Sequence, residues 1–151
     1  MLDDMDRRLL RYWQAEPSLS PGELAERCGM TPGKAARRIS KMEEDGIVQG
    51  VSAVVNWAAL GYAVEVSLRV TLDKTQSNAF DAFLAEARQV PEVIEVQTFL
   101  GRVDVRLSII ARDMAHYQQI YRSRILTLPH IADIEALMQV ARVKSEQTLP
   151  I

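Results

Sequence analysis

The stretch Thr31-Pro-Gly-Lys-Ala-Ala-Arg-Arg-Ile-Ser-Lys-Met-Glu-Glu-Asp45, followed by Gly46, decides the fold of the first part of the chain. Thr31 is a favourable N-cap, and Pro32 suits the first helical position, where a backbone N–H would have no helical partner. Gly46 supplies a C-terminal stop. The stretch therefore predicts one helix with two well-defined ends.

This predicted helix has an apolar stripe and a cationic face. Its apolar residues recur at spacings of three and four, which places them on one side; they are Ala35, Ala36, Ile39 and Met42. The cations lie off that stripe; they are Lys34, Arg37, Arg38 and Lys41. Acidic residues come only at the far end, so the first turns are the part suited to the major groove of DNA. Taken alone, the same pattern also fits an ordinary surface helix with a solvated charged face.

Two helices are predicted before it. Residues 2–14 carry an apolar seam at helical spacing, and the segment from Ser20 to Glu23 has the form of a capping box that opens a helix reaching Cys28. Gly29 ends that helix. A short helix, a brief turn with glycine and a second helix with exposed cations are typical of a helix-turn-helix, so DNA binding is the preferred interpretation.

Composition sets weaker limits. The 151 residues are 48% apolar and 25% charged, as in a globular protein, and the net charge is −2. Residues 1–50 hold eight Lys/Arg against nine Asp/Glu, but four of those eight fall between Lys34 and Lys41, which makes a local basic patch. The single Cys28 permits no intrachain disulfide and favours a reducing cytoplasm. No apolar run of membrane-spanning length occurs, so no membrane partner is expected.

After Gly46 the pattern changes to extended structure. Residues 47–55 are rich in β-branched side chains and predict a strand or short hairpin, and residues 56–61 predict a linker with a helical turn. We expect three parts: a helix-turn-helix domain, winged-helix-like, over 1–50, a linker over 51–61 and a second domain over 62–151.

The second domain alternates between the two periods. Strands are predicted at 62–72, 93–100, 103–111 and 131–143, with a tight turn at Gly101-Arg102 between the middle two. Helices are predicted at 77–89 and from the cap Asp113 to just before Pro129. This βαββαβ order indicates a ferredoxin-like αβ-sandwich, so the whole chain is classed as α+β. Both helices would cover one face of the sheet, and the uncovered face predicts a homodimer.

The chain resembles the leucine-responsive and asparagine regulator (Lrp/AsnC) family of transcription factors over nearly its whole length. The residues that carry the resemblance are Leu2-Asp3, Asp6, Leu9-Leu10, Ser20, Glu23-Leu24-Ala25, Gly29-Met30-Thr31-Pro32, Arg38-Ile39, Met42-Glu43, Gly46-Ile47-Val48, Gly50, Leu60-Gly61, Gly101, Asp104, Leu128-Pro129 and Val143-Lys144. The resemblance implies a transcriptional regulator that binds double-stranded DNA and forms dimers or octamers. It also implies an amino-acid effector, held at contacts between dimers near the turn between the middle strands.

The residues that would read DNA follow from the resemblance; they are Thr31, Gly33, Lys34, Arg37, Arg38 and Lys41. An arginine can address guanine with two hydrogen bonds, whereas Lys34 and Lys41 could contact phosphate only, and the sequence does not decide which residue takes which role. Arg38 has a second possible role, since an arginine at this position can also brace the helix against its own domain.

The effector site implied by the resemblance surrounds the middle turn; its residues are Leu100, Gly101, Arg102, Asp104, Ile134 and Ala136. Asp104 suits an α-ammonium group, and its structural alternative is an ion pair with Arg102 or Arg106. The lining is apolar and favours Leu, Met or a similar amino acid. Ala136 departs from the family, whose amino-acid-binding members tend to have a hydroxyl residue there. The effector therefore uses backbone groups, with Gln139 as a possible polar contact, or the response is altered or lost.

An enzyme is the rival from another class, because some proteins that resemble this family are sirohaem decarboxylases that need histidines near the middle strands. This chain offers His116 and His130 only. No metal-spaced cluster, catalytic triad or phosphate-binding glycine loop occurs, so neither an enzyme nor a cofactor or metal site is expected. A sensor that has lost DNA binding is disfavoured by the Lys34–Lys41 patch.

Overall fold

The computed structural model describes residues 1–151, which form two compact units. The first unit contains residues 1–54 together with 144–151, and the second contains residues 55–143. The expected domain of residues 62–151 differs from this division at its end, because the last eight residues belong to the first unit. None of the helices has the length and apolar character needed to cross a membrane.

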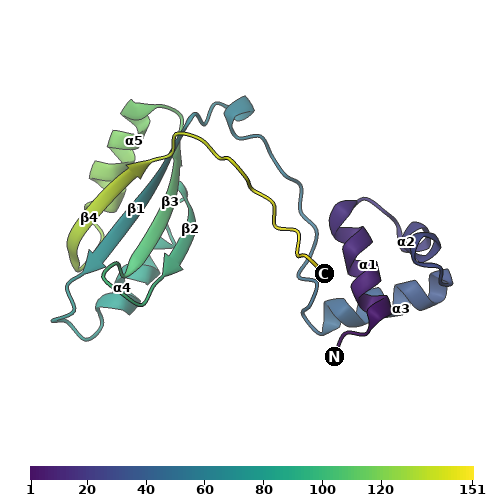
Figure 1. The fold of residues 1–151 in the computed structure, drawn as a ribbon. Coiled ribbons are helices and arrows are strands. Elements are labelled where there is room, and N and C mark those ends of the chain that lie inside the picture. The colour runs from purple at the N-terminus through teal and green to yellow at the C-terminus, as the bar shows by residue number, and fades with distance from the viewer. The chain divides into compact units, whose positions relative to one another are not determined.

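Three helices build the first unit: α1 (Asp4–Ala15), α2 (Pro21–Cys28) and α3 (Pro32–Glu44) (Figure 1). Each begins at a side-chain cap. Asp3 and Asp6 form a capping box on α1, Ser20 and Glu23 form one on α2, and the Thr31 hydroxyl accepts from the Lys34 N–H at 3.4 Å on α3. The apolar stripes of the three helices meet in one core; it contains Leu9, Leu10, Leu24, Ala25, Cys28, Ala35, Ile39 and Met42. The predicted helix-turn-helix is therefore present.

The strand or hairpin predicted over residues 47–55 is wrong. The N–H groups of Ile47 and Val48 both donate to the Met42 carbonyl, and residues 49–56 then adopt no regular structure. β-branched side chains favour an extended backbone, but a strand also needs a neighbouring strand to take its hydrogen bonds, and residues 47–55 have none within this chain. The expected helical turn in the linker is the short 3₁₀ helix η1 (Ala58–Leu60).

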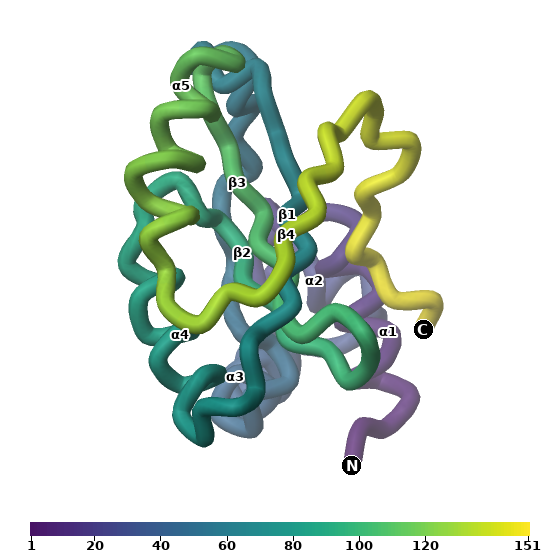
Figure 2. The backbone as a smooth tube through the Cα atoms, turned by 90° about the vertical axis from the view of Figure 1, so that its left-hand side faces the viewer, coloured from purple at the N-terminus to yellow at the C-terminus, as the bar shows by residue number.

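The second unit is an antiparallel four-stranded sheet with strand order β2-β3-β1-β4. The strands are β1 (Val64–Leu72), β2 (Val93–Thr98), β3 (Val105–Ala111) and β4 (Ile131–Met138). The helices are α4 (Ala79–Ala87) and α5 (Met114–Ile120), and α5 continues into a π-helical turn, η2 (Tyr121–Ile125). Figures 1 and 2 show α4 and α5 on the same face of the sheet. The ferredoxin-like α+β prediction is confirmed.

The two faces of the sheet differ in polarity. Side chains that point towards the helices are buried, among them Val66, Leu68, Val70, Val105, Leu107 and Ile109. Residues paired directly across neighbouring strands share a face, so Arg69 lies on the opposite face between Arg106 and Glu135. That open face is therefore mixed, with charged residues beside Ser67, Ser108 and Leu137.

Two predicted boundaries are wrong. The last strand ends at Met138 rather than at residue 143. The connection between β2 and β3 is not a tight two-residue turn but a loop over residues 99–104. The Asp104 N–H donates to the Val70 carbonyl at 3.0 Å, and the Phe99 N–H donates to the Asp104 carbonyl at 2.9 Å. These bonds hold both ends of the loop.

Candidate DNA-binding surface and effector site

The exposed face of α3 carries most of the residues expected to contact DNA. Lys34, Arg37 and Lys41 lie together on it, around a hollow that Arg38, Ser40 and Glu44 also line. Lys34 and Arg37 form no ion pair, and Lys41 makes only a weak 3.5 Å contact with Asp45 one turn later. Three cations with few or no competing carboxylates are therefore available to a polyanion.

The start of α3 can approach a partner closely. Thr31 caps the helix, and Gly33 is exposed, with no atom beyond its chain neighbours and the backbone of its own helix within 4 Å of where a Cβ would lie. The first free N–H groups of the helix lie here and carry partial positive charge, which suits a phosphate oxygen.

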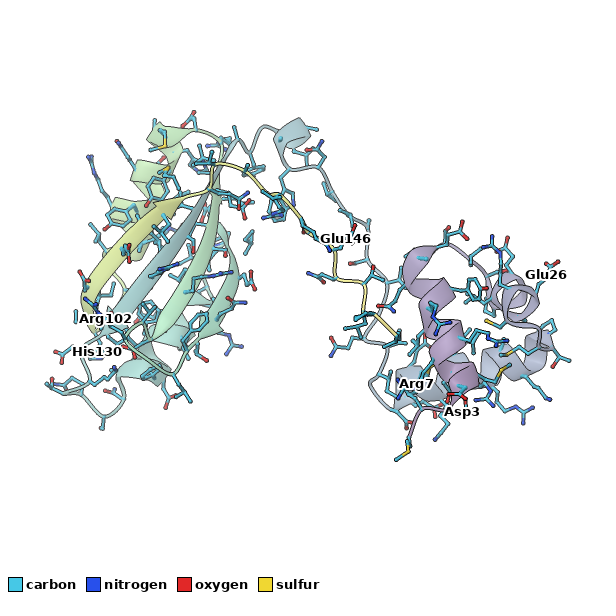
Figure 3. The ribbon with its side chains drawn as sticks, in the orientation of Figure 1. Asp3, Arg7, Glu26, Arg102, His130 and Glu146 are labelled. Carbon is cyan, nitrogen blue, oxygen red and sulfur yellow. The ribbon has the colours of Figure 1, made fainter.

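Arg38 differs from its neighbours because it is already paired. Its Nη1 donates to Asp3 Oδ2 and to Asp6 Oδ1, both at 2.7 Å, and so joins α3 to the start of α1 (Figure 3 labels Asp3). The Asp6 N–H bond and the Arg38 guanidinium together lower the pKa of the Asp3 carboxyl. Of the two roles considered for Arg38, the structure shows the second, in which Arg38 braces α3 against its own domain.

Asp104 is buried, with 3% of its surface exposed. Its Oδ2 accepts from the Leu72 N–H and its Oδ1 lies 2.8 Å from Lys74 Nζ. Burial acts to raise the pKa of Asp104, but the hydrogen bonds from Lys74 and Leu72 outweigh burial, and the pKa is lowered. The ion-pair partner is therefore Lys74, and the expected alternatives Arg102 and Arg106 are wrong; Arg106 lies 3.7 Å from Glu95 instead.

The loop before Asp104 is exposed. Leu100 is fully exposed to solvent. Gly101 adopts φ 149°, a backbone conformation that residues other than glycine rarely adopt. The Arg102 carbonyl accepts from the Thr71 hydroxyl at 3.2 Å, which ties the loop to the end of β1. In Figure 3 Arg102 and His130 lie at this same end of the sheet.

Ile134 and Ala136 lie on β4, beyond β1. Ile134 is opposite Val70, whose carbonyl accepts from Asp104, and Ala136 is opposite Leu68, further along the strand. Ile134 packs against the core while Ala136 is exposed. The structure thus brings Arg102, Asp104 and Ile134 to one end of the sheet and leaves Ala136 further along β4.

The two histidines have structural partners. His116 Nδ1 accepts from the Arg112 N–H at 3.1 Å at the start of α5. His130 adopts φ 62°, and its carbonyl accepts from the Asp73 N–H at 2.7 Å. No group of three or more His, Cys, Asp or Glu residues is placed to hold a metal ion.

Sequence reasoning missed three participants, which are Lys74, Asp3 and Asp6. Lys74 follows β1 in a polar turn, and nothing in its spacing indicated a partner thirty residues later. The roles of Asp3 and Asp6 were also missed, although their acidic character at the start of α1, beside a cationic α3, was a usable signal.

Each of the two units matches a known protein family. Residues 2–49 match the winged helix-turn-helix DNA-binding model, and residues 65–149 match the Lrp/AsnC ligand binding domain. The proline dehydrogenase transcriptional activator of Rhodobacter capsulatus is 30% identical, covering 98% of this chain and 96% of its own. The leucine-responsive regulatory protein of Salmonella typhimurium is 28% identical, with 99% and 92% covered.

Solved structures give the same answer. A Neisseria meningitidis transcriptional regulator in complex with L-Met superposes with a TM-score of 0.91 at 25% identity, covering 99% of this chain and 97% of its own. An AsnC family regulator from Agrobacterium tumefaciens has a TM-score of 0.89 at 28% identity, with the same coverage. Since one family model spans more than half of the chain and the relatives match almost all of it, this protein belongs to the Lrp/AsnC family of DNA-binding transcriptional regulators.

Proposed function

We propose that this regulator responds to an apolar amino acid, bound at the β2–β3 loop where two copies of the chain meet. The observation that carries the proposal is the likeness, over nearly the full length, to the Neisseria meningitidis regulator in complex with L-Met. The loop itself exposes Phe99 and Leu100, and apolar side chains of this kind are well suited to an aliphatic effector side chain.

Recognition of the charged groups of the effector involves Asp104 and Lys74. The effector ammonium binds Asp104, and its carboxylate binds the half-exposed Lys74, so that the zwitterion shares the existing ion pair. Gly101 and Arg102 supply backbone groups. Leu100 and Ile134 make apolar contacts, and Ala136 offers space without a hydrogen bond.

DNA is contacted by the first turns of α3. Lys34 and Lys41 bind phosphates, Arg37 reads a base, and Thr31 and Gly33 bring the backbone close to the groove. Arg38, which is paired with two aspartates, acts mainly by fixing the direction of α3.

Assembly follows from the open face of the sheet. We propose that this face pairs across a twofold axis to form a homodimer, and that dimers combine into a larger even assembly such as an octamer. The mixture of Arg69, Arg106 and Glu135 on the open face allows opposite charges to meet across such an axis.

The protein works by binding alone, with no catalytic step, in the cytoplasm. The relatives are named as regulators, and the histidines that an enzyme of the sirohaem decarboxylase type needs are used here as backbone partners or lie in a turn.

Isothermal titration calorimetry of the full chain tests the effector. Met and Leu should bind more tightly than Asn and Lys, because the loop side chains proposed to contact the effector side chain, Phe99 and Leu100, are apolar. A gel-shift assay with the DNA upstream of the chain's own gene, with and without Met, tests the response. Failure of every amino acid to bind would overturn the effector proposal and leave DNA binding unaffected.

A further inference from the structure

The C-terminal residues 144–151 lie within the DNA-binding unit. The Leu149 N–H donates to Gln14 Oε1 at 2.7 Å, and Arg11 Nε donates to the Ile151 main-chain oxygen at 2.7 Å. The two side chains in these bonds, Gln14 and Arg11, belong to α1. The half-buried Ile151 also packs against the core of the three helices. The tail is thus fixed to the helices by two hydrogen bonds and an apolar contact.

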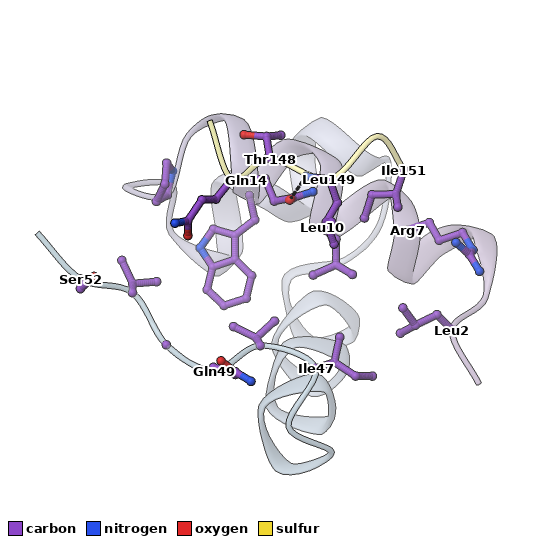
Figure 4. A pocket seen from close by; sticks show the side chains of 16 residues that line it. Leu2, Arg7, Leu10, Gln14, Ile47, Gln49, Ser52, Thr148, Leu149 and Ile151 are labelled. Carbon is purple, nitrogen blue, oxygen red and sulfur yellow. Dashed lines mark hydrogen bonds between the residues drawn. The ribbon is translucent and has the colours of Figure 1, made fainter. Parts of the chain in front are cut away.

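The tail forms one wall of a cleft in this unit (Figure 4). The cleft has a volume of about 500 Å³ and is bounded by α1, by residues 47–52 and by residues 147–151. Leu10 and Trp13 of α1 line it together with Leu149 and Ile151 of the tail, so we expect loss of the tail to open this apolar lining further to water. Such exposure is unfavourable in proportion to the apolar area uncovered, which gives the contact a physical driving force.

We propose that the face of α1 carrying Leu10, Trp13 and Gln14 is a docking surface for residues 147–151 of this same chain, and that the docked tail supports DNA binding. The first reason is the path of contacts from tail to DNA-reading helix. The tail holds α1 through Arg11 and Gln14, and α1 holds α3 through the Arg38 ion pairs.

The second reason is connectivity. The chain leaves the DNA-binding unit after residue 54 and re-enters it at residue 144, so the docked tail adds a second covalent connection to the sheet unit. Two connections restrict the motion of a DNA-binding unit more than one does. Less conformational freedom is then lost when the unit binds DNA, and affinity rises without any new DNA contact.

Removal of residues 147–151 from the full chain tests the proposal. In a Trp57→Phe background, so that Trp13 is the only tryptophan, the shortened chain should show more acrylamide quenching of Trp13 and a red-shifted emission. Its DNA affinity should fall about tenfold, which corresponds to about 1.4 kcal/mol. A synthetic peptide with the sequence of residues 144–151 should bind the shortened chain and restore the Trp13 signal, whereas a scrambled peptide should not.

Two point variants test the same contact in case the shortened chain does not fold. Arg11→Ala removes one tail contact and should raise Trp13 quenching, while Arg8→Ala removes a charge from the same helix without touching the tail and should not. Unchanged quenching and DNA affinity in both the shortened chain and Arg11→Ala would overturn the proposal. Trp13 protection that disappears on dilution would assign the tail to a second copy and overturn docking within one chain.

Discussion

Arg38 Nη1 lies 2.7 Å from Asp6 Oδ1, although the two residues are 32 positions apart in the chain. Asp6 is the less exposed of the two aspartates that share this guanidinium, with 14% of its side chain exposed against 54% for Asp3. The contact divides the basic patch of α3 into two functions. Arg38 links α3 to α1, while Lys34 and Arg37 form no ion pair within the chain, and we propose that they contact DNA.

This division predicts opposite behaviour for neighbouring arginines. Arg38→Ala should lower the free energy of unfolding by about 1 kcal/mol, since it removes two charge-assisted bonds that are only partly shielded from water. Arg37→Ala is the matched control and should stay within about 0.5 kcal/mol. Urea denaturation followed by circular dichroism measures both. Equal stability of the two variants would contradict the brace.

DNA affinity should show the reverse order. Arg37→Ala should weaken binding by about 1–3 kcal/mol and relax sequence preference if Arg37 reads a base. Lys34→Ala should weaken binding to all sequences alike, and the salt slope should become shallower by about 0.9 for each phosphate that the variant no longer neutralises. Fluorescence anisotropy at several salt concentrations separates the two cases, and an affinity that does not change with salt would count against binding through α3.

Acid should destabilise the DNA-binding unit through its helix caps. The Asp6 N–H bond and Arg38 lower the pKa of Asp3, and the bonds with Ser20 lower the pKa of Glu23. A carboxyl whose pKa is lower in the folded state contributes stability that is fully present above the unfolded value, near 4, and lost as pH falls through the folded value. Unfolding midpoints should therefore decrease from about pH 5 downwards. Asp3→Asn should flatten this decrease, and an unchanged profile would exclude Asp3 as a contributor.

The proposed effector site predicts a separation between Asp104 and Lys74. Asp104→Ala leaves the Leu72 N–H without its acceptor and should cost about 1–3 kcal/mol of stability as well as the effector response. Lys74→Gln leaves that hydrogen bond in place and should weaken effector binding with a smaller loss of stability. Calorimetric titration with Met and thermal unfolding measure the two effects. Unchanged Met affinity in Lys74→Gln would exclude Lys74 from the site, and basal DNA binding should persist in both variants.

Assembly should depend on the open face of the sheet. Light scattering should give a dimer or a larger even assembly, since a 17.0 kDa monomer would leave this face uncovered. Leu137→Asp places a third carboxylate beside Asp133 and Glu135 on the open face and should shift the protein towards monomer. Leu149→Asp, in the tail, is the control and should leave the mass unchanged. A wild-type monomer at micromolar concentration would contradict the proposed assembly.

Local patterns in the sequence determined the elements and their ends. Thr31 caps the start of α3 with its hydroxyl, and Pro32 and Gly46 suit the backbone conformations at its two ends. The alternation from Val64 to Leu72 defines the buried face of β1. Such features depend on neighbours a few residues away, so the order of residues in one chain was enough to give the helix-turn-helix, the βαββαβ order and the face of α3 that remains free.

Only the tertiary structure decided the contacts between distant segments. Whether Arg38 meets DNA or Asp6, and whether Asp104 meets Arg102 or Lys74, depends on which loops the fold brings within 3 Å, and charge type alone leaves several partners open. The strand predicted over residues 47–55 is wrong for the same reason. β propensity is a property of one segment, whereas a strand also needs a second strand to receive its hydrogen bonds. The tail, which has no periodicity of its own, acquired its place only from the surface of α1 that it covers.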